Sequence, residues 1–150
     1  MVTSSRPSGA MRVLIADGDR LFTERLMQQL SAEDWIDVVG SAGDGKEAVE
    51  LAASLLPDLV LMNVEMRGVH GIEATRRIGE NVQSMCVLLM SAVDAPKDVD
   101  LALRAGAAGL VRKDSVSPDL IATIFGLASL GVALDPTHTA RDRADVPIIR

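Results

Sequence analysis

The sequence predicts an α/β domain with a parallel β-sheet that helices cover on both faces. Short apolar runs alternate with amphipathic helical segments through residues 12–130, which indicates five strands and five helices. Several of these runs are apolar throughout, as is typical of parallel strands with two covered faces. A chain of 150 residues is long enough to form one domain with its own core.

The first strand–helix unit begins with the apolar run Arg12–Asp17, which ends in an acid. Asp19 follows at the position expected of a helix N-cap. Phe22, Leu26 and Leu30 then recur at i, i+4 and i+8, so we expect a helix that buries this stripe.

The second unit has a β-rich run at Trp35–Val39, which Gly40 is expected to close. Its helix presents one apolar face, made by Ala48, Leu51, Ala52 and Leu55. Pro57 ends this helix, and a third strand leads from it to Asn63.

The remaining units repeat the pattern. Gly68 and Gly71 flank a loop that leads into a helix over Ile72–Ile78. The later expected elements are a strand at Met85–Met90, a helix at Pro96–Ala105, a strand at Gly109–Arg112 and a helix at Pro118–Leu130. We therefore expect the domain to span residues 11–134, between a disordered leader at 1–10 and a linker or tail at 135–150.

The composition restricts the classes of function. A formal net charge of −6 and only three aromatic rings, two Phe and one Trp, disfavour a surface that grips phosphates or stacks bases. No apolar run is long enough to span a membrane, and residues 1–10 lack the apolar core of a secretion signal. We expect a cytoplasmic protein without membrane association. Cys86 is the single cysteine, which excludes an internal disulfide, and we expect it in the core.

Four polar side chains stand where predicted strands end. They are Asp17, Asn63, Ser91 and Lys113, after the first, third, fourth and fifth strands. In a doubly wound sheet, ligands bind beyond the carboxyl ends of the strands. The sequence therefore predicts that these four side chains surround one pocket.

Five segments resemble the receiver domain of two-component response regulators, in particular the NarL/LuxR branch. They read Val-Leu-Ile-Ala-Asp, Gly-Asp-Gly-Lys-Glu-Ala-Val-Glu-Leu, Pro-Asp-Leu-Val-Leu-Met-Asn, Gly-Ile-Glu-Ala-Thr-Arg-Arg-Ile and Ala-Gly-Ala-Ala-Gly-Leu-Val-Arg-Lys-Asp, in this order. The resemblance covers about residues 11–135. It implies a flavodoxin-like (βα)5 fold, a doubly wound parallel sheet with strand order 2-1-3-4-5.

The resemblance also implies a site. In that family, two adjacent acids after the first strand and an aspartate after the third hold Mg²⁺, and this aspartate takes a phosphoryl group from a histidine kinase. A hydroxyl after the fourth strand and a lysine after the fifth bind the phosphoryl oxygens. Asp17 matches the first acid, Ser91 the hydroxyl and Lys113 the lysine.

Four positions depart from the family pattern. Gly18 replaces the second acid, and Asn63 replaces the aspartate that accepts the phosphoryl group. Leu110 replaces the aromatic switch residue, and Arg67 replaces a proline of the third-strand loop. An amide lacks the carboxylate that attacks a phosphohistidine, and Mg²⁺ relies on carboxylates that are missing here. We expect no catalytic residue and no cofactor, with Mg²⁺ binding weak or absent.

Other readings of the pocket residues follow from their ordinary roles. We expect Asp17 and Lys113 to form a structural ion pair in a degenerate phosphorylation pocket. Ser91 is either a strand-end hydroxyl bonded to backbone or a retained switch residue, and the sequence favours neither. Asp19 is expected to be an N-cap, and its carboxylate together with Glu65 leaves weak metal binding open.

The last predicted helix is apolar on more than one face. Between Asp119 and Asp135 the sequence has no charged residue. A helix with one face on a sheet should be polar on the other, so we predict a homodimer interface on this helix. Its candidate residues are Leu120, Ile121, Ile124, Phe125, Leu127 and Leu130.

Together these features predict an atypical receiver domain of an orphan response regulator that acts without conventional phosphorylation. It would control transcription through dimerisation of an attached DNA-binding domain, and promoter DNA would be contacted only by that domain, which this chain does not contain. Two alternatives stay open, a small-molecule sensor that uses the altered pocket and a stand-alone protein-interaction adaptor. We do not expect an enzyme, because no nucleophile–base pair is visible.

Overall fold

The computed structural model describes residues 9–82, 85–92, 96–113 and 118–130. Most of the predicted leader and all of the predicted tail at 135–150 lie outside these residues. The elements are β1 (Met11–Ala16), α1 (Arg20–Ser31), β2 (Ile36–Ala42), α2 (Gly45–Leu55), β3 (Leu59–Asn63), α3 (Gly71–Asn81), β4 (Cys86–Ser91), α4 (Pro96–Arg104), β5 (Gly109–Arg112) and α5 (Pro118–Leu130). Within the described part of the chain, no helix is long and apolar enough to cross a membrane.

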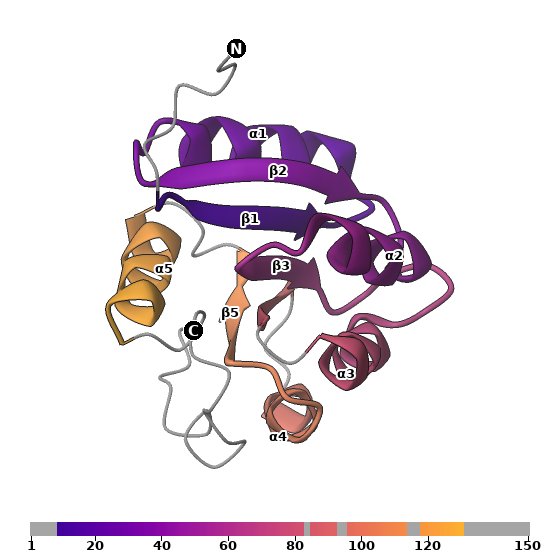
Figure 1. Ribbon diagram of the computed structural model, residues 1–150. Coiled ribbons are helices and arrows are strands. Elements are labelled where there is room, and N and C mark those ends of the chain that lie inside the picture. Colours follow the sequence, from indigo (N-terminus) through magenta and orange to yellow (C-terminus); the bar gives the residue numbers. More distant parts are fainter. Residues whose placement is uncertain (1–8, 83–84, 93–95, 114–117, 131–150) are drawn as a thin grey trace.

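The strands form one parallel sheet in the order β2-β1-β3-β4-β5. This order confirms the predicted flavodoxin-like, doubly wound fold. Helices lie on both faces of the sheet, with α1 and α5 on one face and α2, α3 and α4 on the other (Figure 1).

The strand β2 extends past Gly40, the residue expected to close it. The register between β1 and β2 shifts between Val13 and Leu14, so that Leu14 pairs with Gly40. A Cβ at Gly40 would lie 3.0 Å from the Leu55 side chain of α2. Gly40 therefore provides room for helix packing, and the prediction that it ends the strand is wrong.

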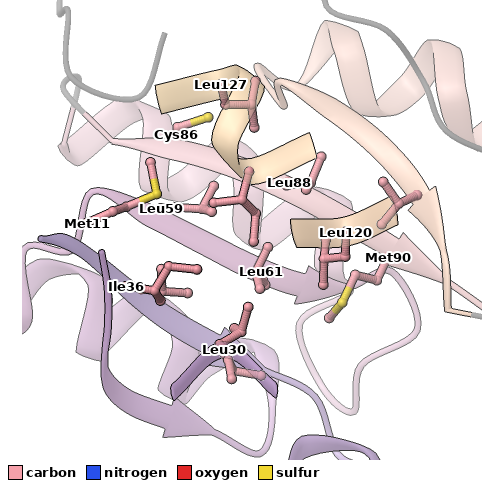
Figure 2. Close-up of a cluster of buried hydrophobic side chains, with 14 of the residues drawn as sticks. Met11, Leu30, Ile36, Leu59, Leu61, Cys86, Leu88, Met90, Leu120 and Leu127 are labelled. Carbon is pink, nitrogen blue, oxygen red and sulfur yellow. The ribbon is translucent and has the colours of Figure 1, made fainter. Parts of the chain in front are cut away.

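The buried side chains divide into two clusters because successive strand residues point to opposite faces. Val13 and Ile15 of β1 belong to one cluster, and Leu14 and Ala16 belong to the other. Figure 2 shows the first cluster, where Leu30 of α1 and Leu120 and Leu127 of α5 pack over the strands. Cys86 lies in this cluster, as predicted.

The position of α5 shows that the predicted dimer interface is wrong for some of its residues. Leu120, Ile124 and Leu127 are buried in the core cluster, because their i, i+4, i+7 spacing forms the stripe that packs on the sheet. Ile121 is partly buried against the same cluster, and Phe125 is 59% exposed. The Leu130 side chain lies outside the described residues. Three of the candidate residues are thus core residues, and Phe125 alone among the described candidates is largely exposed.

Candidate functional site

A cleft of about 390 Å³ lies at the carboxyl edge of the sheet. Since all five strands run in parallel, the ends of β1, β3 and β5 meet there. The residues that line the cleft are Asp17, Gly18, Asp19, Gly43, Asn63, Glu65, Arg67 and Lys113. The predicted pocket therefore exists, and it contains three of the four strand-end side chains.

An ion pair between Asp17 and Lys113 crosses the cleft. Lys113 Nζ lies 2.7 Å from Asp17 Oδ2, and the Asp17 side chain is 0% exposed while that of Lys113 is 14% exposed. The structure thus confirms the predicted pair. Asp17 Oδ2 has no other partner among the described residues, so the Lys113 ammonium is the group that compensates this buried oxygen.

Lys113 also contacts an aromatic ring that the sequence did not link to the site. Its ammonium lies 4.1 Å from the centroid of the Phe22 ring, a cation–π contact. Phe22 belongs to the stripe of α1 that packs on the core. Its helical spacing explains the packing, while the approach of Lys113 depends on how β5 and α1 are placed in space.

Asn63 lies at the end of β3 and is 9% exposed. Its Nδ2 donates to the Glu65 carbonyl at 3.0 Å and lies 3.4 Å from Asp17 Oδ1. Its Oδ1 accepts from the Glu65 backbone N–H at 3.4 Å. The amide thus holds the loop after β3 with both a donor and an acceptor, a pattern that requires Asn in place of Asp.

Asp19 is the N-cap of α1, as predicted. Its Oδ1 accepts from the Phe22 backbone N–H at 3.1 Å, and its own N–H donates to Asp17 Oδ1 at 2.9 Å. Asp19 is exposed at the rim of the cleft. Its carboxylate is therefore used by the helix terminus, which is a common role of aspartate at this position.

Two predicted residues lie beside the cleft and do not line it. Ser91 is 1% exposed at the end of β4, where it pairs in register with Arg112 of β5. Leu110 is 6% exposed and packs in the second core cluster. A buried leucine fills the switch position with apolar packing and offers no hydroxyl or ring.

Close backbone contacts shape the rim of the cleft. A Cβ at Gly71 would lie 2.2 Å from the Asn63 carbonyl oxygen, so glycine lets α3 begin directly against the loop after β3. His70 caps that helix, because its Nδ1 accepts from the Ile72 backbone N–H at 3.3 Å. A Cβ at Gly18 would lie 3.2 Å from the Gly43 carbonyl oxygen, which is close for a side chain.

The residues of the cleft do not fit a magnesium site. The single buried carboxylate, that of Asp17, is neutralised by Lys113, and Asp19 caps a helix. Glu65 is exposed. Within the described ranges, no three His, Cys, Asp or Glu side chains are grouped so that they could hold a metal ion. Mg²⁺ depends on carboxylates that keep their charge for the ion, and this donor set does not supply them.

Comparison with known families agrees with the fold. The model of the response regulator receiver domain matches residues 13–125. The chain belongs to this family.

The most similar relatives include NarL-type regulators. The probable transcriptional regulatory protein NarL of Mycobacterium tuberculosis is 36% identical over 118 residues, which cover 79% of this chain and 55% of that protein. The nitrate/nitrite response regulator protein NarL of Escherichia coli is 33% identical over 137 residues, which cover 89% of this chain and 63% of that protein. The chain therefore spans somewhat more than half the length of these relatives.

A solved structure supports the same assignment. The receiver domain of the response regulator NarL from Mycobacterium tuberculosis is 35% identical, with a TM-score of 0.76 over 80% of this chain and 97% of that chain. The chain is thus similar to the receiver domains of NarL-family transcriptional response regulators.

Proposed function

We propose that this chain is a receiver domain that works without phosphorylation, as part of a NarL-type regulator of transcription. The observation that carries the proposal is Asn63 at the end of β3, where its amide replaces the nucleophilic carboxylate. The nitrogen of an amide is not nucleophilic and its oxygen carries no full charge, so phosphoryl transfer to this position has no acceptor.

The surroundings of Asn63 support the same proposal. Its Nδ2 donates to the Glu65 carbonyl and faces Asp17 Oδ1. A carboxylate at position 63 would place negative charge against both oxygens. The loop after β3 is therefore stabilised by the amide itself, and the cleft is built for a neutral side chain at this position.

Intact-mass measurement after incubation with acetyl phosphate and Mg²⁺ tests the proposal. We expect the wild-type mass to stay unchanged, and the same for Asn63→Asp, because Gly18 leaves the metal site short of an acid. A receiver domain that carries both acids and the acceptor aspartate serves as the positive control. Stoichiometric addition of one phosphoryl group to the wild-type chain would contradict the proposal.

A double variant separates the two missing acids. We expect Gly18→Asp together with Asn63→Asp to acquire some phosphoryl group where the single variants do not. The yield should be limited, because a Cβ at position 18 lies 3.2 Å from the Gly43 carbonyl oxygen and the β2–α2 loop must shift. Equal phosphorylation of Asn63→Asp alone would show that Gly18 is not the limiting residue.

We also propose that the regulator acts as a homodimer whose contacts include α5, so that an attached DNA-binding domain is paired on promoter DNA. The exposed ring of Phe125 supports this, since it packs edge-on against Trp35 with centroids 5.6 Å apart. Leu101 of α4 is 49% exposed and marks the alternative face of α4, β5 and α5.

Sedimentation of matched variants distinguishes these faces. We expect Phe125→Ser to shift the wild-type dimer to monomer and Leu101→Ser to leave it unchanged. The opposite result would move the interface to α4. A wild-type chain that sediments as a monomer at high concentration would contradict the dimer.

A small-molecule sensor is the second candidate function, and the volume of the cleft favours it. A space of about 390 Å³ bounded by Asn63, Arg67 and Lys113 is large enough for a metabolite with polar groups. A thermal-shift screen against metabolites tests it, and Arg67→Ala, which removes a cation from the lining of the cleft, should reduce any ligand-dependent rise in Tm. No ligand-dependent rise in Tm for the wild-type chain would remove this candidate in favour of an adaptor with one conformation.

A further inference from the structure

We propose that the Lys113 ammonium takes the place of a bound metal cation in this cleft, so that the chain supplies its own counter-ion to Asp17. The inference rests on the proposed function, because it presupposes that the wild-type cleft does not use Mg²⁺. It adds a second physical reason for the absence of Mg²⁺ binding. Besides the loss of two acids, a side chain already occupies the position of the cation.

The contacts of Asp17 define this position. Its side chain is 0% exposed, and its Oδ1 accepts from the Asp19 N–H at 2.9 Å and faces Asn63 Nδ2 at 3.4 Å. Its Oδ2 lies 2.7 Å from Lys113 Nζ and has no other partner among the described residues. A buried carboxylate requires such compensation, so removal of the ammonium leaves an oxygen that needs another cation.

The contacts of Lys113 hold the ammonium at this oxygen. Phe22 presents its ring 4.1 Å from Nζ. The Lys113 side chain is 14% exposed, so water competes little for the charge. Phe22 is therefore a positioning residue, which keeps the ammonium on Asp17.

Removal of the ammonium frees the Asp17 carboxylate to take a small divalent cation in its place. Asp17, Asn63 and Glu65 all line the cleft. Hard cations such as Mn²⁺ prefer carboxylate and carbonyl oxygens. The experiment therefore uses Mn²⁺ alone as the probe.

Lys113→Met is the test variant, because methionine keeps an unbranched apolar chain against Phe22 and removes the charge. In about 10 mM MnCl₂, compared with NaCl of equal ionic strength, we expect the Tm of this variant to rise by about 3 °C through linkage. We expect no specific rise for the wild-type chain, and none for Asp17→Asn combined with Lys113→Met. Mn²⁺ binding counted by electron paramagnetic resonance should follow the same order.

Two results would overturn the inference. One is a Lys113→Met variant with no Mn²⁺-specific rise in Tm, and the other is a wild-type chain with a rise of equal size. Should Lys113→Met fail to fold, Lys113→Gln takes its place with the same expected results. The proposed function is tested separately by phosphorylation of the wild-type chain. If Lys113→Met shows no Mn²⁺-specific rise in Tm while the wild-type chain stays unphosphorylated, this inference alone is rejected.

Discussion

The two edges of the β-sheet hold their charged side chains in different ways. At the amino edge, Arg12 Nη1 donates to the Leu55 and Leu56 carbonyls at 2.7 and 2.9 Å, and the Arg12 N–H donates to Asp58 Oδ2 at 2.9 Å. At the carboxyl edge, Asp17 Oδ2 depends on one ammonium 2.7 Å away. Most contacts at the first edge go to backbone, and the decisive contact at the second goes to one side chain.

This difference separates scaffold from site. The Arg12 side chain caps the C-terminus of α2, where Leu56 adopts the left-handed conformation with φ of 50°. The last carbonyls of a helix have no partner within the helix, so they need such donors. Backbone carbonyls remain in place whatever the ligand, so this edge has one stable arrangement. At the carboxyl edge a single substitution leaves a buried charge unpaired, and we expect stability and ligand binding to be coupled there.

Lys113→Ala is expected to have the largest effect. It leaves the Asp17 carboxylate buried without its counter-ion, which we expect to lower the free energy of unfolding by about 3 kcal/mol. Urea denaturation measures it. The neutral pair Asp17→Asn with Lys113→Met is the control and should recover most of the loss. A loss in Lys113→Ala no larger than that of the control would show that the charge is not the cause.

Arg12→Met should lower the free energy of unfolding about half as much as Lys113→Ala does. The variant loses two charge-assisted hydrogen bonds to the end of α2 and retains much of the apolar stem, so we expect a loss of about 1.5 kcal/mol. The same urea experiment measures it, and Mn²⁺ should not change the result. An effect larger than that of Lys113→Ala would reverse the comparison between the two edges.

Phe22→Leu tests the cation–π contact. We expect a coupling of about 1 kcal/mol between Phe22 and Lys113 in a double-mutant cycle with Lys113→Met, because the ammonium is mostly shielded from water. The cycle removes the packing change that the leucine causes by itself. A coupling near zero would leave Asp17 as the only residue that positions the ammonium.

The smallest effect is expected at Glu73, on the exposed face of α3. Hydrogen bonds from Arg76 and Arg77 hold the pKa of Glu73 below its usual value of 4.5. A lowered folded-state pKa contributes stability above the unfolded pKa and loses it as the pH falls through the folded value. The difference in Tm between wild type and Glu73→Gln should therefore be small at pH 7 and vanish under acid. A difference that grows below pH 4.5 would contradict this sign.

The residues at the strand ends show how much of the site could be predicted from the sequence. The apolar runs before Asp17, Asn63 and Lys113 marked buried strands, and parallel strands bring their carboxyl ends together. The ion pair between Asp17 and Lys113 and the N-cap at Asp19 followed from these positions. Ser91, by contrast, is buried and lies outside the lining of the cleft. The sequence could not predict this, because it has no signal for whether the side chain at the end of β4 lines the cleft or is buried beside it.

The helix α5 shows where the sequence was insufficient. Its apolar residues on several faces predicted an interface, yet Leu120, Ile124 and Leu127 pack in the core. Beyond Asp119 this helix has no charged residue to mark its exposed side, so its rotation about its own axis cannot be predicted from periodicity. Packing against the sheet determined which stripe is buried and left Phe125 at the surface.

The amino acids in their order were enough to predict the alternation of strands and helices, the family, and the replacement of an acceptor aspartate by Asn63, because hydrophobic periodicity and residue chemistry are local properties. Folding in three dimensions decided that Phe22 meets Lys113, that Asn63 Nδ2 faces Asp17 Oδ1, and that α5 buries one stripe. These outcomes depend on distances between residues far apart in the chain, and such distances arise only when the helices pack on the sheet.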